Sequence, residues 1–200
     1  EKTGLVPSPE WKRSAFKSRR AQVWFPGETV IMGIGQGYVT STPLQLAHMA
    51  GIVGMRGASF QPRLVRQFRD PTTRKVTPVA PKGLPAPDVG DAKNWDVAIA
   101  GMFAVTHGGT ASRSAAGAPY SIAGKTGTAQ WGPTDRQRIA AWFAGFLPAD
   151  NPQYSFAALY EGEPNVKAGG GSHAAPLIGQ VFKEVYKRKA KPAETSESAP

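Results

Sequence analysis

The chain contains 200 residues, of which 40% are hydrophobic and 19% are charged, and it carries a formal net charge of +10. This length and composition fit one globular domain with a sizeable core and exclude an intrinsically disordered chain. Because it has no cysteine, disulfides, cysteine-ligated zinc sites and cysteine nucleophiles are also excluded. No run of about 18 apolar residues and no signal peptide is visible in it.

Part of the positive charge lies in two clusters, one near each end of the chain. The first comprises Lys12, Arg13, Lys17, Arg19 and Arg20, and the second comprises Lys183, Lys187, Arg188, Lys189 and Lys191. Such clusters are found on solvated surfaces and also on surfaces that bind nucleic acid, anionic lipid or anionic polymer. We expect no nucleic-acid partner, because aromatic residues are not interleaved with these charges and no zinc-finger or RNP motif is present.

The first basic cluster contains a serine in a pattern that resembles a nucleophile motif. Ser14-Ala15-Phe16-Lys17 fits S-x-x-K, in which the serine attacks the substrate in penicillin-recognising enzymes. That motif needs its serine at the start of a helix in a mainly apolar setting, whereas Ser14 lies between Arg13 and Arg19-Arg20. We therefore interpret this match as fortuitous.

The first strongly predicted helix follows a Gly-rich segment and runs from Pro43 to about Val53. Thr42 and Gln45 are spaced as a capping box at its start, and Pro43 suits the first turn. The helix is apolar nearly all round, which predicts burial. His48 has no second ligand at metal-like helical spacing, so we interpret it as a core or rim residue.

The middle of the chain is expected to form a strand at 60–68, a loop through Asp91 and a second helix at about 94–106. One face of this helix comprises Trp95, Ile99, Met102, Phe103 and Thr106. His107 falls in the last turn, where an imidazolium interacts favourably with the helix dipole, and we interpret it as structural.

The stretch 121–130 alternates small and polar residues, which predicts an extended strand. It contains Gly124-Lys125-Thr126-Gly127-Thr128. Lys125 supplies positive charge and the two threonines supply hydroxyl donors, a combination suited to an anion beside a reacting carbonyl. Gly127 allows a ligand to lie against the backbone, and a peptide can pair with the edge of such a strand.

Two nucleotide-binding patterns are incomplete in this chain. The segment 33–38 lacks the third glycine of G-x-G-x-x-G, because Tyr38 occupies that position. Gly124-Lys125-Thr126 matches the second half of the P-loop, but Pro119 stands where its first glycine is required. The residues that follow are also strand-like, whereas a P-loop continues into a helix. We therefore exclude both sites.

Two apolar runs at 138–147 and 154–160 are joined by a short turn and predict an antiparallel hairpin. Both runs lack polar alternation, so we expect helices on both faces of the sheet. The glycines at 169–171 are interpreted as a flexible turn, and a last helix is predicted from 174 to about 187. We expect residues 188–200 to form a disordered tail.

Several motifs occur in the order found in class B penicillin-binding proteins, which are serine acyltransferases that recognise D-Ala-D-Ala peptides and β-lactams. These motifs are Trp11-Lys12, Gly33-Ile34-Gly35-Gln36-Gly37-Tyr38, Thr42-Pro43-Leu44-Gln45, Gly109-Thr110-Ala111, Gly124-Lys125-Thr126-Gly127-Thr128-Ala129-Gln130 and Ala141-Trp142-Phe143-Ala144-Gly145-Phe146. The resemblance covers about residues 5–185, and within the class the chain most resembles the elongation transpeptidases.

The resemblance implies an α+β fold in which helices cover both faces of an antiparallel sheet, as in penicillin-binding transpeptidases and serine β-lactamases, incomplete in this chain. It also implies roles for the central strand. Lys125 is expected to support the anionic character of the site and the proton relay. Thr126 and Thr128 are expected to hold the substrate carboxylate, and the backbone N–H of Thr128 to be one of two oxyanion donors. Gly127 is expected to keep the strand edge clear.

The resemblance also identifies what this sequence lacks. In the family, the serine motif and S-x-N precede every motif quoted above, and no S-x-N occurs here. Ser14 falls after the place where S-x-N is expected. We therefore expect residues 1–187 to be the carboxyl-terminal part of a transpeptidase domain whose nucleophile is not in this chain. The parent protein is expected to cross-link peptidoglycan through an acyl-serine, and this chain alone to be inactive.

The family chemistry implies no cofactor and no metal. The expected ligands are peptidoglycan stem peptides ending in D-Ala-D-Ala and β-lactams, and the expected partner is a glycan-polymerising membrane protein of the elongation machinery. The resemblance implies anchoring in the bacterial inner membrane through a segment not present here, with the catalytic domain in the periplasm. Two alternatives stay open: a non-catalytic peptide-binding or scaffold module of the same fold, and a basic nucleic-acid binder supported by charge alone.

Overall fold

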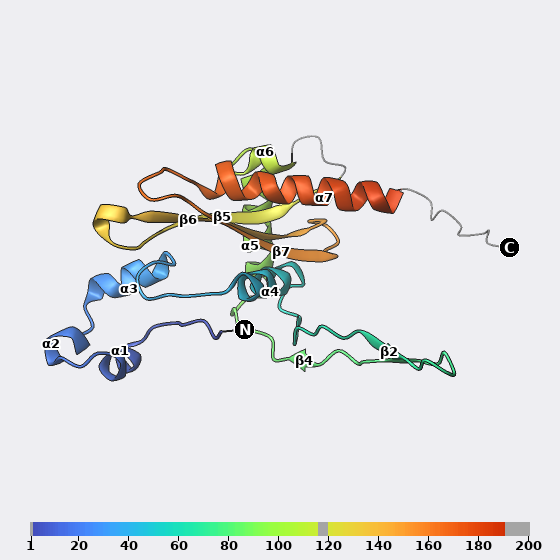
Figure 1. Cartoon of the computed structure of the whole chain (residues 1–200), viewed down its shortest axis with the longest axis horizontal. Coiled ribbons are helices and arrows are strands. Elements are labelled where there is room, and N and C mark those ends of the chain that lie inside the picture. The colour runs from blue at the N-terminus through green and yellow to red at the C-terminus, as the bar shows by residue number, and fades with distance from the viewer. Residues whose placement is uncertain (1, 116–119, 191–200) are drawn as a thin grey trace.

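The computed structural model describes residues 2–115 and 120–190. Within them, a three-stranded antiparallel sheet lies between helices (Figure 1). Helix α7 (Ala175–Ala190) and the short α6 (Ser112–Ala115) lie over one face of the sheet, and α4 (Pro43–Gly54) lies on the other. The expected α+β fold, with helices on both faces of an antiparallel sheet, is confirmed.

The sheet consists of β5 (Ala123–Trp131), β6 (Arg138–Leu147) and β7 (Tyr154–Glu161), in the order β5–β6–β7. The predicted hairpin is therefore confirmed, and it is formed by β6 and β7. A 3₁₀ turn, η1 (Thr134–Arg136), connects β5 to β6. Because β5 ends the strand order, one of its two edges is not paired with β6, and we call this its outer edge.

Side chains alternate between the two faces of the sheet, which we call the α7 face and the α4 face. On the α7 face, Phe143 and Phe156 are buried in one cluster with Ile178 and Phe182 of α7. On the α4 face, the fully buried ring of Phe146 packs against Gly54 at the end of α4. The strands lack polar alternation because both faces are covered in this way.

Helix α4 begins with the predicted capping box and is less buried than expected. The backbone N–H of Gln45 donates to Thr42 Oγ1 at 3.2 Å, and that of Thr42 donates to Gln45 Oε1 at 2.9 Å. Only Ala50 and Gly54 of this helix are buried. The prediction of all-round burial is wrong, because in the described part of the chain α4 packs against β6, β7 and α5 and leaves its remaining surface exposed.

Helix α5 (Lys93–His107) confirms the second predicted helix and is fixed to the start of β5. Thr106 is buried, and its hydroxyl donates to the carbonyl of Phe103 at 2.9 Å and also contacts the carbonyl of Ile122. His107 stacks on Phe103 with ring centroids 3.6 Å apart. This arrangement agrees with its structural interpretation.

The amino-terminal part forms three short helices that the sequence analysis missed. They are α1 (Pro9–Ala15), α2 (Arg19–Gln22) and α3 (Pro26–Gly33). Lys12 is buried rather than part of a solvated cluster: its ammonium contacts Glu28, donates to the carbonyl of Val23 at 2.7 Å, and lies 5.4 Å from the ring centroid of Phe25. A buried lysine with an acidic partner and aromatic neighbours organises this region.

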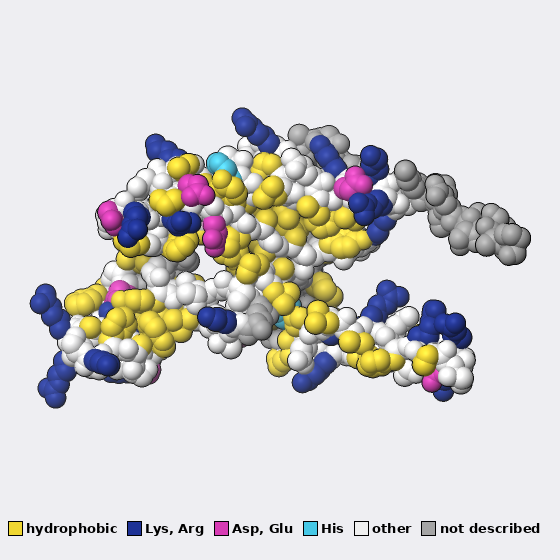
Figure 2. Space-filling view, in the orientation of Figure 1, with side chains coloured by type: hydrophobic (Ala, Val, Ile, Leu, Met, Phe, Trp, Pro, Cys, Tyr) yellow, Lys and Arg dark blue, Asp and Glu magenta, His cyan; other side chains and the backbone are white. Residues whose placement is uncertain are grey.

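An extended arm at 59–84 takes the place of the single strand predicted at 60–68. It consists of two two-stranded ladders, β1 (Ser59–Phe60) with β4 (Gly83–Leu84) and β2 (Gln67–Arg69) with β3 (Val76–Pro78). The predicted strand is formed only at its two ends, by Phe60 of β1 and by Gln67 and Phe68 of β2. Its middle is not a strand, and Pro62 there has no N–H to donate to a ladder. Figure 2 shows apolar and basic side chains exposed along this arm.

The last helix extends beyond its predicted end. A π-helical turn, η2 (Gly170–Ala174), precedes α7, which continues to Ala190. Residues 188–190, assigned to the tail, are therefore helical, and the remainder of the predicted tail, 191–200, lies outside the described residues.

Two helix glycines provide a matched test of this packing. A Cβ at Gly54 would lie 2.8 Å from the ring of Phe146, whereas one at Gly101 would meet no described atom within 4 Å. We expect Gly54→Ala to destabilise the chain by about 1–3 kcal/mol through overpacking. Gly101→Ala should stabilise it by about 0.5–1 kcal/mol, because alanine favours the helix. Urea unfolding monitored by circular dichroism measures both, and equal midpoints would contradict this packing.

The contact between Lys12 and Glu28 predicts a pH dependence of stability. The hydrogen bond from Lys12, followed by that from the backbone N–H of Phe25, lowers the pKa of the Glu28 carboxyl. The resulting stabilisation is complete above the ordinary glutamate pKa and is lost as pH falls through the lowered value. We expect Glu28→Gln to lower the urea midpoint at pH 7, and the difference from wild type to shrink below about pH 4.

Glu163→Gln is the control for this experiment, because Glu163 is exposed and lies outside the amino-terminal helices. Its urea midpoint should follow that of wild type throughout. A Glu28→Gln deficit that stays constant from pH 7 to pH 3 would show that the ionised carboxylate does not stabilise this region.

Candidate active site

The predicted site residues all lie on β5, and its register divides them between the two faces of the sheet. Lys125 is opposite Ala144 and Gly127 is opposite Trp142, on the α4 face. Thr126 is opposite Phe143, which belongs to the core on the α7 face, and Thr128 projects to that same face. A ligand that contacts all four residues must therefore lie along the outer edge of the strand.

Two backbone carbonyls identify which residues of β5 face that outer edge. The ammonium of Lys125 donates to the carbonyl of Thr126 at 2.6 Å, and the side-chain amide of Gln36 donates to the carbonyl of Thr128 at 3.4 Å. In an antiparallel strand, one residue directs its N–H and C=O to the same edge, and residues two apart share that edge. The N–H of Thr128 therefore faces the outer edge as well.

The hydroxyl of Thr126 is held by a second threonine, Thr110. The two Oγ1 atoms are 2.9 Å apart, and Thr110 follows the glycines that end α5. Thr110 belongs to the Gly109-Thr110-Ala111 motif, and its contact with Thr126 was not predicted from the sequence. The contact fixes the orientation of the Thr126 hydroxyl beside the outer edge of β5.

Gly170 and Gly171 pack tightly, and the prediction of a flexible turn at 169–171 is wrong. A Cβ on Gly170 would lie 2.2 Å from the carbonyl oxygen of Trp142 and 2.8 Å from that of Gly127. A Cβ on Gly171 would lie 1.8 Å from the carbonyl oxygen of Thr110. Only glycine permits this close approach, so the backbone of η2 packs directly against β5, β6 and Thr110.

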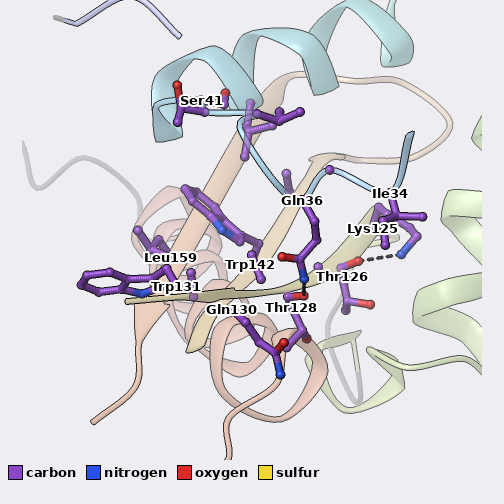
Figure 3. Close-up of a pocket in the computed structure, with 18 of the residues that line it drawn as sticks. Ile34, Gln36, Ser41, Lys125, Thr126, Thr128, Gln130, Trp131, Trp142 and Leu159 are labelled. Atoms are coloured by element: carbon purple, nitrogen blue, oxygen red, sulfur yellow. Dashed lines mark hydrogen bonds between the residues drawn. The ribbon is translucent and has the colours of Figure 1, made fainter. Parts of the chain in front are cut away.

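A pocket of about 590 Å³ lies beside the outer edge, between the α4 face of the sheet and the segment that joins α3 to α4 (Figure 3). Residues 125–128, all predicted as site residues, line it. Its apolar surface includes Trp142 and Leu159 from the sheet and Leu46 from α4. Sequence reasoning missed Gln36, which lines the pocket and reaches β5 in Figure 3. The only signal for it in the sequence was its place in the motif 33–38.

Ser14 and the histidines lie in other surroundings. Ser14 is exposed on α1, its hydroxyl donates to the carbonyl of Trp11 at 2.8 Å, and it is not among the described residues that line the pocket. His48 is half-buried, with Nε2 at 3.5 Å from Ser59 Oγ, and His107 contacts the carbonyl of Phe103 at 2.9 Å. The structure thus brings Lys125 near the two threonines without Ser14.

Two negative findings concern residues 2–115 and 120–190. In these ranges, histidine, aspartate and glutamate do not gather in groups of three or more that suit a metal ion. Over the same ranges, each helix is too short or too polar to cross a bilayer.

Comparison with known families gives one match over most of the chain. The family model described as "Penicillin binding protein transpeptidase domain" matches residues 1–187.

A curated relative and two solved structures agree with this match. The peptidoglycan D,D-transpeptidase MrdA of Haemophilus influenzae is 32% identical over 198 residues, which is 91% of this chain and 29% of the relative. Pseudomonas aeruginosa PBP2 in complex with WCK 5153 has a TM-score of 0.73 and 39% identity over 99% of this chain and 42% of its own. PBP2 of Helicobacter pylori, in a complex with MreC, has a TM-score of 0.65 and 28% identity over 93% of this chain and 32% of its own. The chain therefore spans less than a third of the curated relative.

Proposed function

This chain belongs to the penicillin-binding protein transpeptidase family, and from that premise we propose that it is the substrate-binding, carboxyl-terminal part of a peptidoglycan D,D-transpeptidase of the elongation type. The observation that carries the proposal is the outer edge of β5. There the backbone N–H and C=O groups of Thr126 and Thr128 face outward. The ammonium of Lys125 and the hydroxyls of the two threonines lie along the same edge, beside the pocket.

In this proposal a stem peptide adds to the outer edge of β5 as one more strand. Its backbone pairs with the outward N–H and C=O groups of Thr126 and Thr128. Its terminal carboxylate accepts hydrogen bonds from the two threonine hydroxyls, and the charge of Lys125 favours that anion. The Oγ1 of Thr110, 2.9 Å from that of Thr126, keeps the first of these hydroxyls oriented toward the ligand.

The proposed reaction proceeds through an acyl-serine in two steps. A serine oxygen adds to the carbonyl of the penultimate D-Ala, and the C–N bond to the last D-Ala breaks as the departing amine takes a proton. The amine of a second stem peptide then attacks the ester and releases the serine. The backbone N–H of Thr128 stabilises the oxyanion in both steps, and one such donor accounts for about a hundred- to a thousandfold in rate.

We place the serine nucleophile outside these 200 residues. This placement is supported by the missing S-x-N motif and by the surroundings of Ser14, which is exposed on α1 and does not line the pocket. It follows that this chain alone is inactive as an acyltransferase, whereas the longer protein to which it belongs forms the acyl-serine and reacts with β-lactams.

Partners and location are part of the same proposal. An elongation transpeptidase works beside a glycan-polymerising membrane protein, and we propose such a partner for the longer protein. The solved complex of H. pylori PBP2 with MreC makes a protein of the MreC type a second candidate. We also propose an inner-membrane protein whose catalytic domain lies in the periplasm.

Substitution of Lys125 tests the proposal. We test this in the longest protein that the gene encodes. There we expect Lys125→Ala to reduce the rate of acylation by a fluorescent penicillin by about 10²–10³-fold, because the variant loses the positive charge that favours the anionic ligand. Lys183→Ala is the matched control, since Lys183 is exposed on α7 and outside the pocket. Normal acylation by Lys125→Ala would contradict the role of Lys125. A wild-type protein that binds D-Ala-D-Ala peptide but is never acylated would favour the non-catalytic binding module.

A further inference from the structure

Gln36 makes a contact with the active strand that the proposed chemistry does not use. Its side-chain amide donates to the carbonyl of Thr128 at 3.4 Å, although the two residues are 92 positions apart. Gln36 is half-buried, whereas its neighbours Gly35 and Gly37 are exposed. Figure 3 shows its side chain extending from that segment to β5.

The carbonyl that Gln36 contacts is one that an added strand requires. It belongs to the outward-facing backbone of β5, and an incoming peptide forms its ladder by donating N–H groups to such carbonyls. One N–H donor on this carbonyl already comes from Gln36. A peptide that pairs with this edge of β5 must therefore displace the Gln36 amide or share the carbonyl with it.

The residues on either side of Gln36 are glycines, which adopt several backbone conformations readily. Gly35 and Gly37 have φ values of 75° and 71°, in the left-handed region that glycine adopts readily. A Cβ on Gly35 would meet no described atom within 4 Å, so its backbone conformation rather than crowding calls for glycine there. Gln36 thus sits between two conformationally permissive positions in an exposed connection between α3 and α4.

We propose that Gln36 is a positioning residue that holds the carbonyl of Thr128 and yields it to the substrate, so that it sets how strongly a peptide pairs with β5. This inference rests on the proposed function of β5 as the substrate-pairing strand. The ligand class concerned is any substrate or inhibitor that presents a backbone-like amide N–H to this edge.

The test uses the longest protein that the gene encodes and a fluorescent penicillin that carries an amide N–H. Stopped-flow acylation separates the dissociation constant of the first complex from the rate constant of acylation. We expect Gln36→Ala to lower the dissociation constant about two- to fivefold, the effect of removing one long hydrogen bond, with the acylation rate constant unchanged. Gln36→Met keeps much of the side-chain length and stays neutral but has no N–H to donate, and it should act in the same direction.

Gln180→Ala is the control, because Gln180 is exposed on α7 and outside the pocket; it should behave as wild type. If the penicillin labels the wild-type protein but the dissociation constant of Gln36→Ala is unchanged or raised, the inference about Gln36 is wrong and the transpeptidase proposal stands. A change in the acylation rate constant with a lowered unfolding midpoint would also overturn it, because that pattern indicates a purely structural role. A wild-type protein that is never labelled would overturn the transpeptidase proposal, and this inference with it.

Discussion

The outer edge of β5 is the constraint on which the rest of the site depends. The backbone of an antiparallel strand presents hydrogen-bonding groups to one edge at every second residue only. The contacts of Lys125 and Gln36 place Thr126 and Thr128 on that edge, with the odd-numbered residues turned toward β6. The proposed roles of this strand depend on the even-numbered residues facing the outer edge. A shift of the register by one residue would turn them toward β6 and remove these roles.

Close backbone packing holds this register in place. A Cβ on Gly145 would lie 2.2 Å from the carbonyl oxygen of Ala123, and one on Gly124 would lie 2.7 Å from the ring of Phe143. Gly170 approaches the strand pair as closely from the α7 side. Because protein interiors tolerate little change in volume, these contacts leave β5 few ways to shift. The binding edge is thus held in place, whereas the segment around Gln36 has two glycines in the left-handed conformation, Gly35 and Gly37.

The elements that sequence predicted well are those whose pattern is local. The capping box at Thr42 and Gln45 and the two apolar runs of the hairpin define their own structures, and the strand at 121–130 was placed nearly to the residue. The predictions failed where a distant partner decides the outcome. Burial of Lys12 depends on Glu28 and aromatic rings, the close packing of Gly170 depends on β5 and β6, and the contact of Gln36 spans 92 residues. Periodicity carries no information about such contacts.

The central claim is that this chain supplies the substrate-pairing strand while the nucleophile lies elsewhere in the protein. Labelling with a fluorescent penicillin tests it most directly, with denaturing electrophoresis and intact mass as the readout. The 200-residue chain and the longest protein that the gene encodes are treated side by side. The account predicts a covalent label on the longer protein alone. A label on the 200-residue chain would contradict it and would identify Ser14 or another serine of this chain as a nucleophile.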